Sequence, residues 1–154
     1  MPVLRPAAVA ALFLCLVPIL PAAGKPALKT ADYDGKVLPL AKVLEKQGVK
    51  LDADAGPTSL ALAADDGKVY PLVKDDGSRM FYKDDRLLNR RMHLTARLLP
   101  EVGMLQVVQV QSWHGDQLYD VYYWCDVCSI RRPEKGKCDC CGGPLHLREE
   151  PAQK

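Results

Sequence analysis

The fold class is decided by the run Met92-His93-Leu94-Thr95-Ala96-Arg97-Leu98, in which apolar and polar side chains alternate. A period of two places successive side chains on opposite faces of a strand, so this run predicts a β-strand with one buried face. A turn at Pro100–Gly103 follows, and Leu105–Val110 is a second apolar run of strand length. Two successive strands are therefore expected in this part of the chain.

Further short strands are predicted on both sides of these two. Leu60–Ala63 and Val69–Val73 flank an Asp-Asp-Gly-Lys turn, which is the pattern of a β-hairpin. A single helical turn is expected at Asp85–Asn89, and Leu118–Trp124 predicts the last strand. Because a small barrel buries such strands without leaving long open edges, we predict a β domain of this kind over residues 58–124.

The N-terminal residues have the pattern of an export signal. Arg5 provides a positive charge, an apolar stretch follows, and Ala22-Ala23-Gly24 supplies the small residues that precede a cleavage site. We therefore predict a signal peptide over residues 1–24, a secreted or periplasmic protein, and no stable membrane span after cleavage. The alternative is an uncleaved anchor, since the uncharged stretch is almost as long as the ~20 residues of a spanning helix. Pro18 and Pro21 argue against that anchor.

Residues 25–57 are interpreted as a polar lead segment followed by one amphipathic helix. Apolar residues recur there at helical spacing, namely Val37, Leu40, Val43 and Leu44. Pro39 falls in the first turn, where its missing N–H costs little, and Gly48 can end the helix. The apolar side of this helix is expected to face the core.

The composition is that of a globular chain with little net charge. Of 154 residues, 48% are hydrophobic and 26% are charged, and the formal net charge is +2. This balance argues against nucleic acid as a partner, because it exerts no long-range attraction on polyanions. A local basic stretch beside Phe81 and Tyr82 leaves open a contact with bases, but Asp84 and Asp85 offset it and favour a solvated face. The basic residues concerned are Arg79, Lys83, Arg86, Arg90, Arg91 and Arg97.

Five of the six cysteines lie near the C-terminus, where they form two Cys-x-x-Cys pairs separated by nine residues. Each pair can turn two sulfurs toward one ion, and four thiolates make the closed tetrahedral site of structural zinc. The predicted ligands are Cys125, Cys128, Cys138 and Cys141, with Cys140 as an alternate ligand. We therefore predict a metal knuckle over residues 125–148 and a tail over 149–154. Zn²⁺ is the leading ion, and Cu(I) and iron also accept thiolates.

Two other interpretations of these cysteines remain open. In an oxidising compartment, bridges such as Cys125–Cys141 or Cys128–Cys138 would staple the segment, although an odd number of cysteines cannot all pair. Alternatively, Cys125 and Cys128 have the spacing of a thiol–disulfide exchanger. Such an exchanger needs its first cysteine at a helix N-terminus, whereas the Tyr and Trp before Cys125 predict a strand.

Two stretches also resemble known families. The run Leu88–Ala96 resembles the one that enters the third strand of secreted OB-like domains, with Ala96 in place of the usual Gly. The C-terminal segment resembles zinc-ribbon and rubredoxin-like knuckles, and also the heavy-metal-binding domain appended to bacterial metal pumps and efflux adaptors. In that last domain Met and His follow the first Cys, where this chain has Val127 and Cys128, which implies an all-sulfur ligand set.

Over its whole length the chain resembles uncharacterised secreted planctomycete-type bacterial proteins that end in Tyr-Tyr-Trp-Cys-Asp-x-Cys…Cys-x-Cys-Cys-Gly-Gly-Pro. This resemblance implies no particular activity. The chain also contains no nucleophile elbow, paired-His hydrolase motif, phosphate loop or dinucleotide-binding motif.

The sequence thus predicts a mainly β protein, with a small OB-like barrel, one N-terminal helix and a C-terminal zinc-ribbon-like knuckle. Its expected role is that of a secreted, non-catalytic metal-binding module that binds or scaffolds an unspecified protein or small ligand. The alternatives are an extracytoplasmic metal-handling protein and a thiol–disulfide redox protein. The oligomeric state is left open.

Overall fold

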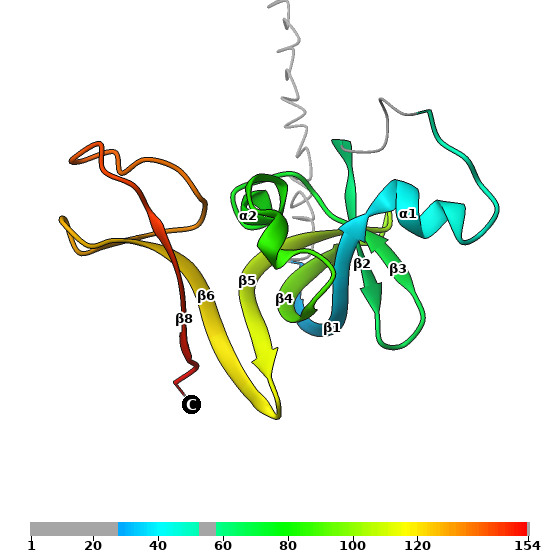
Figure 1. Cartoon of the computed structure of the whole chain (residues 1–154). Helices are drawn as coiled ribbons and strands as arrows, with labels where there is room; N and C mark the ends of the chain where they lie inside the picture. The colour runs from blue at the N-terminus through cyan, green and yellow to red at the C-terminus, as the bar shows by residue number, and fades with distance from the viewer. Residues whose placement is uncertain (1–27, 53–57, 154) are drawn as a thin grey trace, which may run out of the picture.

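The computed structural model describes residues 28–52 and 58–153, so the predicted signal peptide over residues 1–24 lies outside the described residues. The mainly β class is confirmed, because the strands form one eight-stranded antiparallel sheet (Figure 1). No helix in the described ranges is long and apolar enough to cross a membrane. The elements are β1 (Thr30–Pro39), α1 (Leu40–Glu45), β2 (Leu60–Ala64), β3 (Val69–Pro71), α2 (Arg79–Lys83), the 3₁₀ turn η2 (Asp85–Leu87), β4 (Arg91–Leu99), β5 (Met104–His114), β6 (Gln117–Cys125), β7 (Ile130–Arg132) and β8 (His146–Pro151).

The first five strands are paired in a ring. They follow the order β3-β2-β1-β4-β5, and a parallel bridge between Leu72 and Leu105 joins the end of β3 to β5. At this closure the Val73 N–H donates to the Leu105 carbonyl at 2.9 Å. We call these five strands the barrel lobe. Its assignment to the OB-like class stays a prediction.

Strand β1 is the main element that differs from the sequence interpretation. The sequence predicts a lead segment and the start of a helix over residues 30–39, but these residues pair with both β2 and β4. The predicted helix is present only as the short α1, and Val37 is a fully buried strand residue. The apolar spacing is compatible with either element, and partners distant in sequence decide between them. The β domain therefore begins well before residue 58.

The alternation that predicted β4 is confirmed, since Met92, Leu94 and Ala96 are fully buried. In β5 the register with β4 shifts at Thr95/Ala96, so that Val108 is one extra residue on its strand. Such a bulge restarts the alternation. Residues on both sides of it therefore face the core, namely Leu105, Val107, Val110 and Ser112.

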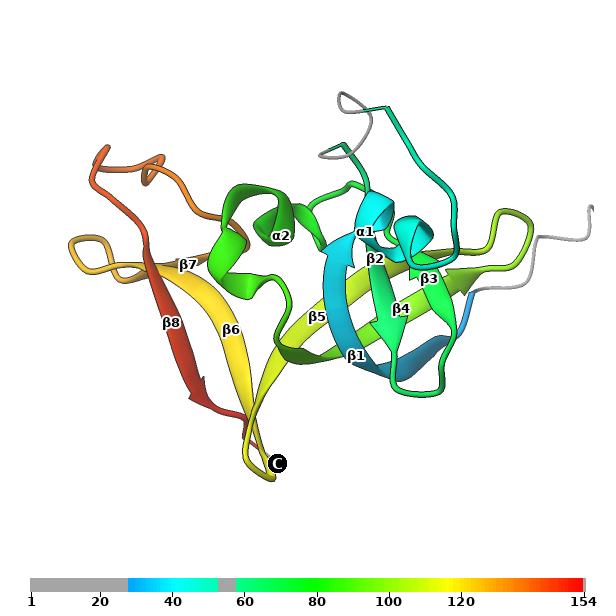
Figure 2. The ribbon, with the colours of Figure 1, turned by 45° about the vertical axis from the view of Figure 1, so that its right-hand side comes forward.

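Strand β6 carries the C-terminal part of the protein. Residues 117–120 pair with β5, residues 123–125 pair with β7, and residues 119–124 pair with β8 on the other edge. We call β6 to β8 the ribbon lobe, and Figure 2 shows α2 lying between it and the barrel lobe. The predicted division after residue 124 thus falls inside β6.

Strand β8 extends to Pro151 and so includes the first residues of the predicted tail, residues 149–154. The segment His146–Pro151 lacks β-branched residues and contains Glu and Pro, which are depleted in strands. Its strand conformation comes from antiparallel pairing with β6. Local composition therefore does not indicate this strand.

Candidate metal centre

The first cysteine pair lies where β6 ends and turns toward β7. The Ser129 N–H donates to the Cys125 carbonyl at 2.8 Å, and the Cys128 N–H donates to the Cys125 sulfur at 3.4 Å. Ser129 has a φ of 53°, the left-handed conformation that usually selects glycine. The backbone thus forms a tight turn that brings both sulfurs to one side and donates an N–H to a sulfur.

The second pair forms a matching turn. The Gly142 N–H donates to the Cys138 carbonyl at 2.8 Å, and Gly142 has a φ of 71°. The left-handed conformation of this turn thus falls on Gly142, whereas Gly143 does not adopt a positive φ. Two further bonds close the loop around this turn, Cys138 N–H to Gly143 O at 2.8 Å and Leu145 N–H to Gly136 O at 3.0 Å.

The two turns bring four sulfurs together. The Sγ atoms of Cys125, Cys128, Cys138 and Cys141 all lie within 4.8 Å of one another, and Cys125 and Cys141 are 3.5 Å apart. Four Zn–S bonds of ~2.3 Å in a tetrahedron would separate the sulfurs by ~3.8 Å. A disulfide would need an S–S distance of ~2.05 Å, so the observed spacing fits a shared ion better. The predicted set of four cysteines is thus brought together.

Burial differs among the five cysteines. Cys125 and Cys138 are 1% and 2% exposed, whereas Cys141 is exposed at the surface. The site is therefore closed on the core side and open on the other. Cys140 is also exposed and does not belong to the group of four, so its alternate role as a ligand is not needed here.

The thiols do not share the same electrostatics. Hydrogen bonds from the backbone N–H groups of Cys141 and Cys140 lower the pKa of Cys138 to about 7. By contrast, hydrogen bonds with the thiols of Cys140 and Cys141 raise the pKa of Cys128 well above its ordinary value. The Cys138 sulfur is thus stabilised as a thiolate, whereas the neighbouring thiols disfavour a second negative charge on Cys128. A cation held by the four sulfurs would supply the positive charge that lets all of them ionise.

A buried acid beside the centre positions β6. Asp84 is 3% exposed and accepts a hydrogen bond from the Tyr123 hydroxyl at 2.8 Å and from Arg86 Nε at 2.8 Å. The largest of several effects, the Arg86 hydrogen bond, keeps the pKa of Asp84 far below its ordinary value. Because Tyr123 lies two residues before Cys125, this contact fixes the strand that presents the first ligand.

A second polar cluster joins the two lobes, and the sequence interpretation did not find it. Glu149 of β8 accepts two hydrogen bonds from Arg90, at 2.8 and 2.7 Å, and one from Ser112 of β5 at 2.6 Å. His114 Nε2 lies 2.6 Å from the same carboxylate. Burial alone would raise the pKa of Glu149, but these contacts lower it to about 2. No short motif marks this cluster, because its members are far apart in the sequence.

Comparisons with protein-family models, curated proteins and solved structures found no match to this chain. The function is therefore inferred from the site itself.

Proposed function

We propose that this chain is a secreted, non-catalytic metal-binding protein in which a structural Zn²⁺ holds the ribbon lobe on a β scaffold. The observation that carries the proposal is the convergence of four Sγ atoms within 4.8 Å, presented by two separate backbone turns. Four thiolates at this spacing suit the tetrahedral coordination of Zn²⁺. Secretion follows from the sequence pattern of residues 1–24.

The position of the sulfurs supports a structural role for the ion. Cys125 and Cys138 belong to the buried core cluster together with Leu145 and Tyr123. The segment between β7 and β8 has no regular strand of its own and contributes few buried apolar residues. Metal coordination then supplies the folding free energy that apolar burial does not.

A redox function has less support than a structural one. An exchanger needs its nucleophilic cysteine at the N-terminus of a helix, where the dipole stabilises the thiolate. Here β6 ends at Cys125, and residues 126–129 form a turn. The hydrogen bonds with the Cys140 and Cys141 thiols that raise the pKa of Cys128 also disfavour the thiolate form that attack by Cys128 would need.

A metal-handling function is the second candidate, because one side of the site is open. Cys141 is exposed, and Cys128 is only half-buried. Exposed ligands permit exchange of the ion with an acceptor. This alternative expects the ion to leave while the barrel lobe remains folded.

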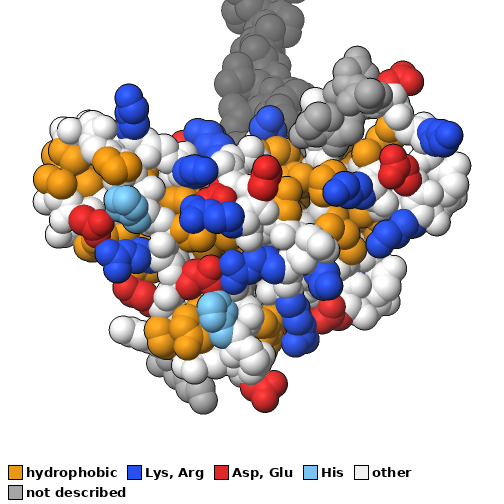
Figure 3. Space-filling view, in the orientation of Figure 1, with side chains coloured by type: hydrophobic (Ala, Val, Ile, Leu, Met, Phe, Trp, Pro, Cys, Tyr) orange, Lys and Arg blue, Asp and Glu red, His pale blue; other side chains and the backbone are white. Residues whose placement is uncertain are grey.

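The charges on the surface support a partner other than nucleic acid. Lys and Arg side chains lie among Asp and Glu side chains on the face shown in Figure 3. Most members of the basic stretch have acidic partners within 4 Å, namely Arg79 with Asp76, Lys83 with Glu134, Arg86 with Asp84, Arg90 with Glu149 and Arg91 with Asp65. Paired charges leave little to attract phosphates.

The test is metal and thiol analysis of the full chain after secretion from a bacterial host. Elemental analysis is expected to give one zinc per chain, and thiol alkylation in denaturant after chelation should modify five cysteines. Cys128→Ser should lose the metal, whereas the matched control Cys140→Ser should keep it. Replacement by Co²⁺ should give the absorption bands of tetrahedral thiolate coordination.

The alternatives give different results in the same experiment. Disulfides mapped between the four cysteines with no ion bound would refute the zinc site. Rapid loss of zinc to a chelator without a change in the far-ultraviolet circular dichroism of the protein would favour metal handling over a structural role.

A further inference from the structure

A cleft opens where β5 separates from β6. Their pairing runs from the turn only as far as Gln111 and Asp120, and β6 next pairs with β7 at Tyr123 and Arg132. Figure 1 shows the two strands diverging from their shared turn, with α2 at the open end. Between these points Gly77 lies against the Val107 carbonyl, and β5 residues 108–110 have no strand on this edge in the part of the chain that the structure describes.

The cleft has a volume of about 340 Å³ and a mixed lining, in which apolar side chains lie beside Gln109, Arg131 and Arg132. Its main apolar members are Met80, Val108, Val110, Val121 and Tyr122. Val108 is the extra residue of the bulge and is 47% exposed, so its side chain is accessible in the cleft. This volume lies within the range of ~300–1,000 Å³ typical of ligand sites.

Positive charge borders the apolar lining. Arg131 is exposed and lies 4.0 Å from the centre of the Tyr122 ring, and it makes no ion pair with any residue in the described ranges. Arg132 and Pro133 are shared with an adjoining groove of about 320 Å³. In that groove Arg79, Lys83 and Arg132 are paired with Asp76, Glu134 and Asp139. Lys135 and Lys137 line the same groove and have no acidic partner within 4 Å among the described residues.

We propose that this cleft binds an extended peptide segment of a partner protein, with an apolar side chain in the cleft and a neighbouring carboxylate on Arg131. An exposed strand edge hydrogen-bonds an extended backbone, and pockets beside it select the side chains. The guanidinium of Arg131, which has no ion-pair partner among the described residues, and the nearby unpaired Lys135 and Lys137 select an acidic residue. This inference rests on the binding role in the proposed function and names the class of partner that would be bound. The peptide site is separate from the four cysteines.

The test is selection of a phage-displayed random heptapeptide library on the zinc-loaded full chain. We expect enriched sequences that combine a β-branched or other apolar residue with Asp or Glu. A synthetic fluorescent peptide of the enriched sequence should then bind with an affinity that falls at least about tenfold for Arg131→Glu and for Val108→Asp. Lys50→Glu, which makes the same charge change at an exposed position away from the cleft, should bind like wild type.

Zinc content and circular dichroism of each variant separate loss of binding from loss of fold. Because zinc is measured independently, failure of the peptide site leaves the test of the metal centre unaffected. The proposal is overturned if no sequence is enriched, if enriched sequences lack acidic residues, or if Arg131→Glu binds within twofold of wild type. It is equally overturned if Lys50→Glu loses as much affinity as Arg131→Glu.

Discussion

The contact between the lobes can be tested through Glu149. Its carboxylate has a pKa of about 2 in the folded protein, against an ordinary value of 4.5. Each pKa unit corresponds to ~1.4 kcal/mol of preference for the ionised form, so the shift is worth about 3 kcal/mol at pH 7. The side chain is 17% exposed, so solvent screening removes little of this. Replacing Glu149 by Gln is therefore expected to lower the free energy of unfolding by about 3 kcal/mol.

The sign of the pH dependence follows from the same shift. Because the folded pKa lies below the unfolded one, the contribution is fully present above pH 4.5 and disappears as the pH falls toward about 2. The difference between wild type and Glu149→Gln should thus be constant from pH 7 to 5 and shrink below that. Urea unfolding followed by tryptophan fluorescence measures it. Titrating groups that do not contact Glu149, including the cysteines, affect both proteins alike and cancel in the difference.

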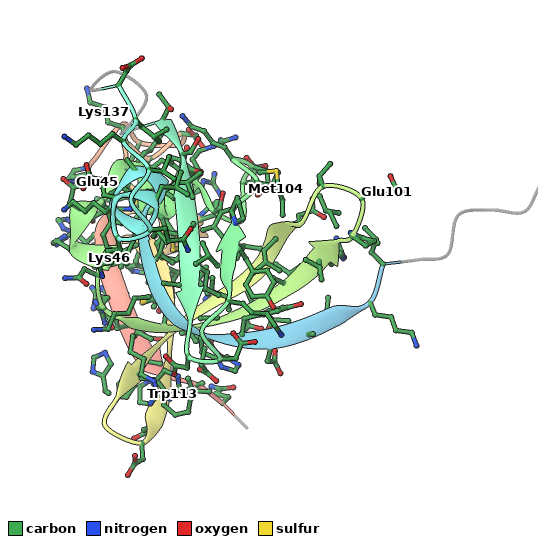
Figure 4. The ribbon with its side chains drawn as sticks, turned by 90° about the vertical axis from the view of Figure 1, so that its right-hand side faces the viewer. Glu45, Lys46, Glu101, Met104, Trp113 and Lys137 are labelled. Carbon is green, nitrogen blue, oxygen red and sulfur yellow. The ribbon has the colours of Figure 1, made fainter. Side chains whose placement is uncertain are left out.

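Glu101→Gln is the matched control, since Figure 4 shows Glu101 at the turn between β4 and β5, away from β8. This change should alter stability by less than ~0.5 kcal/mol. The role assigned to Glu149 is wrong if Glu149→Gln costs less than 1 kcal/mol at pH 7, or if the difference from wild type does not shrink between pH 5 and pH 2.

Three further changes test other parts of the structure. Ser129→Gly should raise the free energy of unfolding by up to ~1 kcal/mol, because Ser129 has a φ of 53°; urea unfolding would contradict this if stability fell. Tyr123→Phe should cost ~1–2 kcal/mol in the same assay by removing a donor to buried Asp84, and unchanged stability would count against that bond. Chelation of the metal at pH 7 should lower the Tm, and added Zn²⁺ should restore it, whereas a Tm indifferent to both would contradict a structural ion.

The sequence predicted those features that depend on local pattern. Alternation around Leu94 identified β4, and the spacing of the two Cys-x-x-Cys pairs identified the four sulfurs that come together. The sequence interpretation failed where contacts with residues distant in the chain determine the local structure. Val37 fits a helix by spacing but lies in a strand because β2 and β4 flank it, and Glu149 has no local feature that indicates Arg90 as its partner.

Strand β6 limits how this protein can be divided or recombined. Its first residues hydrogen-bond to β5, and its last residue is the first cysteine of the metal centre. A graft of the metal centre onto another scaffold would therefore have to start near Gln117 rather than at Cys125. The graft would also need an acceptor in place of Asp84 for the hydrogen bond that the Tyr123 hydroxyl donates. The cysteine segment therefore depends on β6 and on Asp84, and we expect that it cannot be transferred without them.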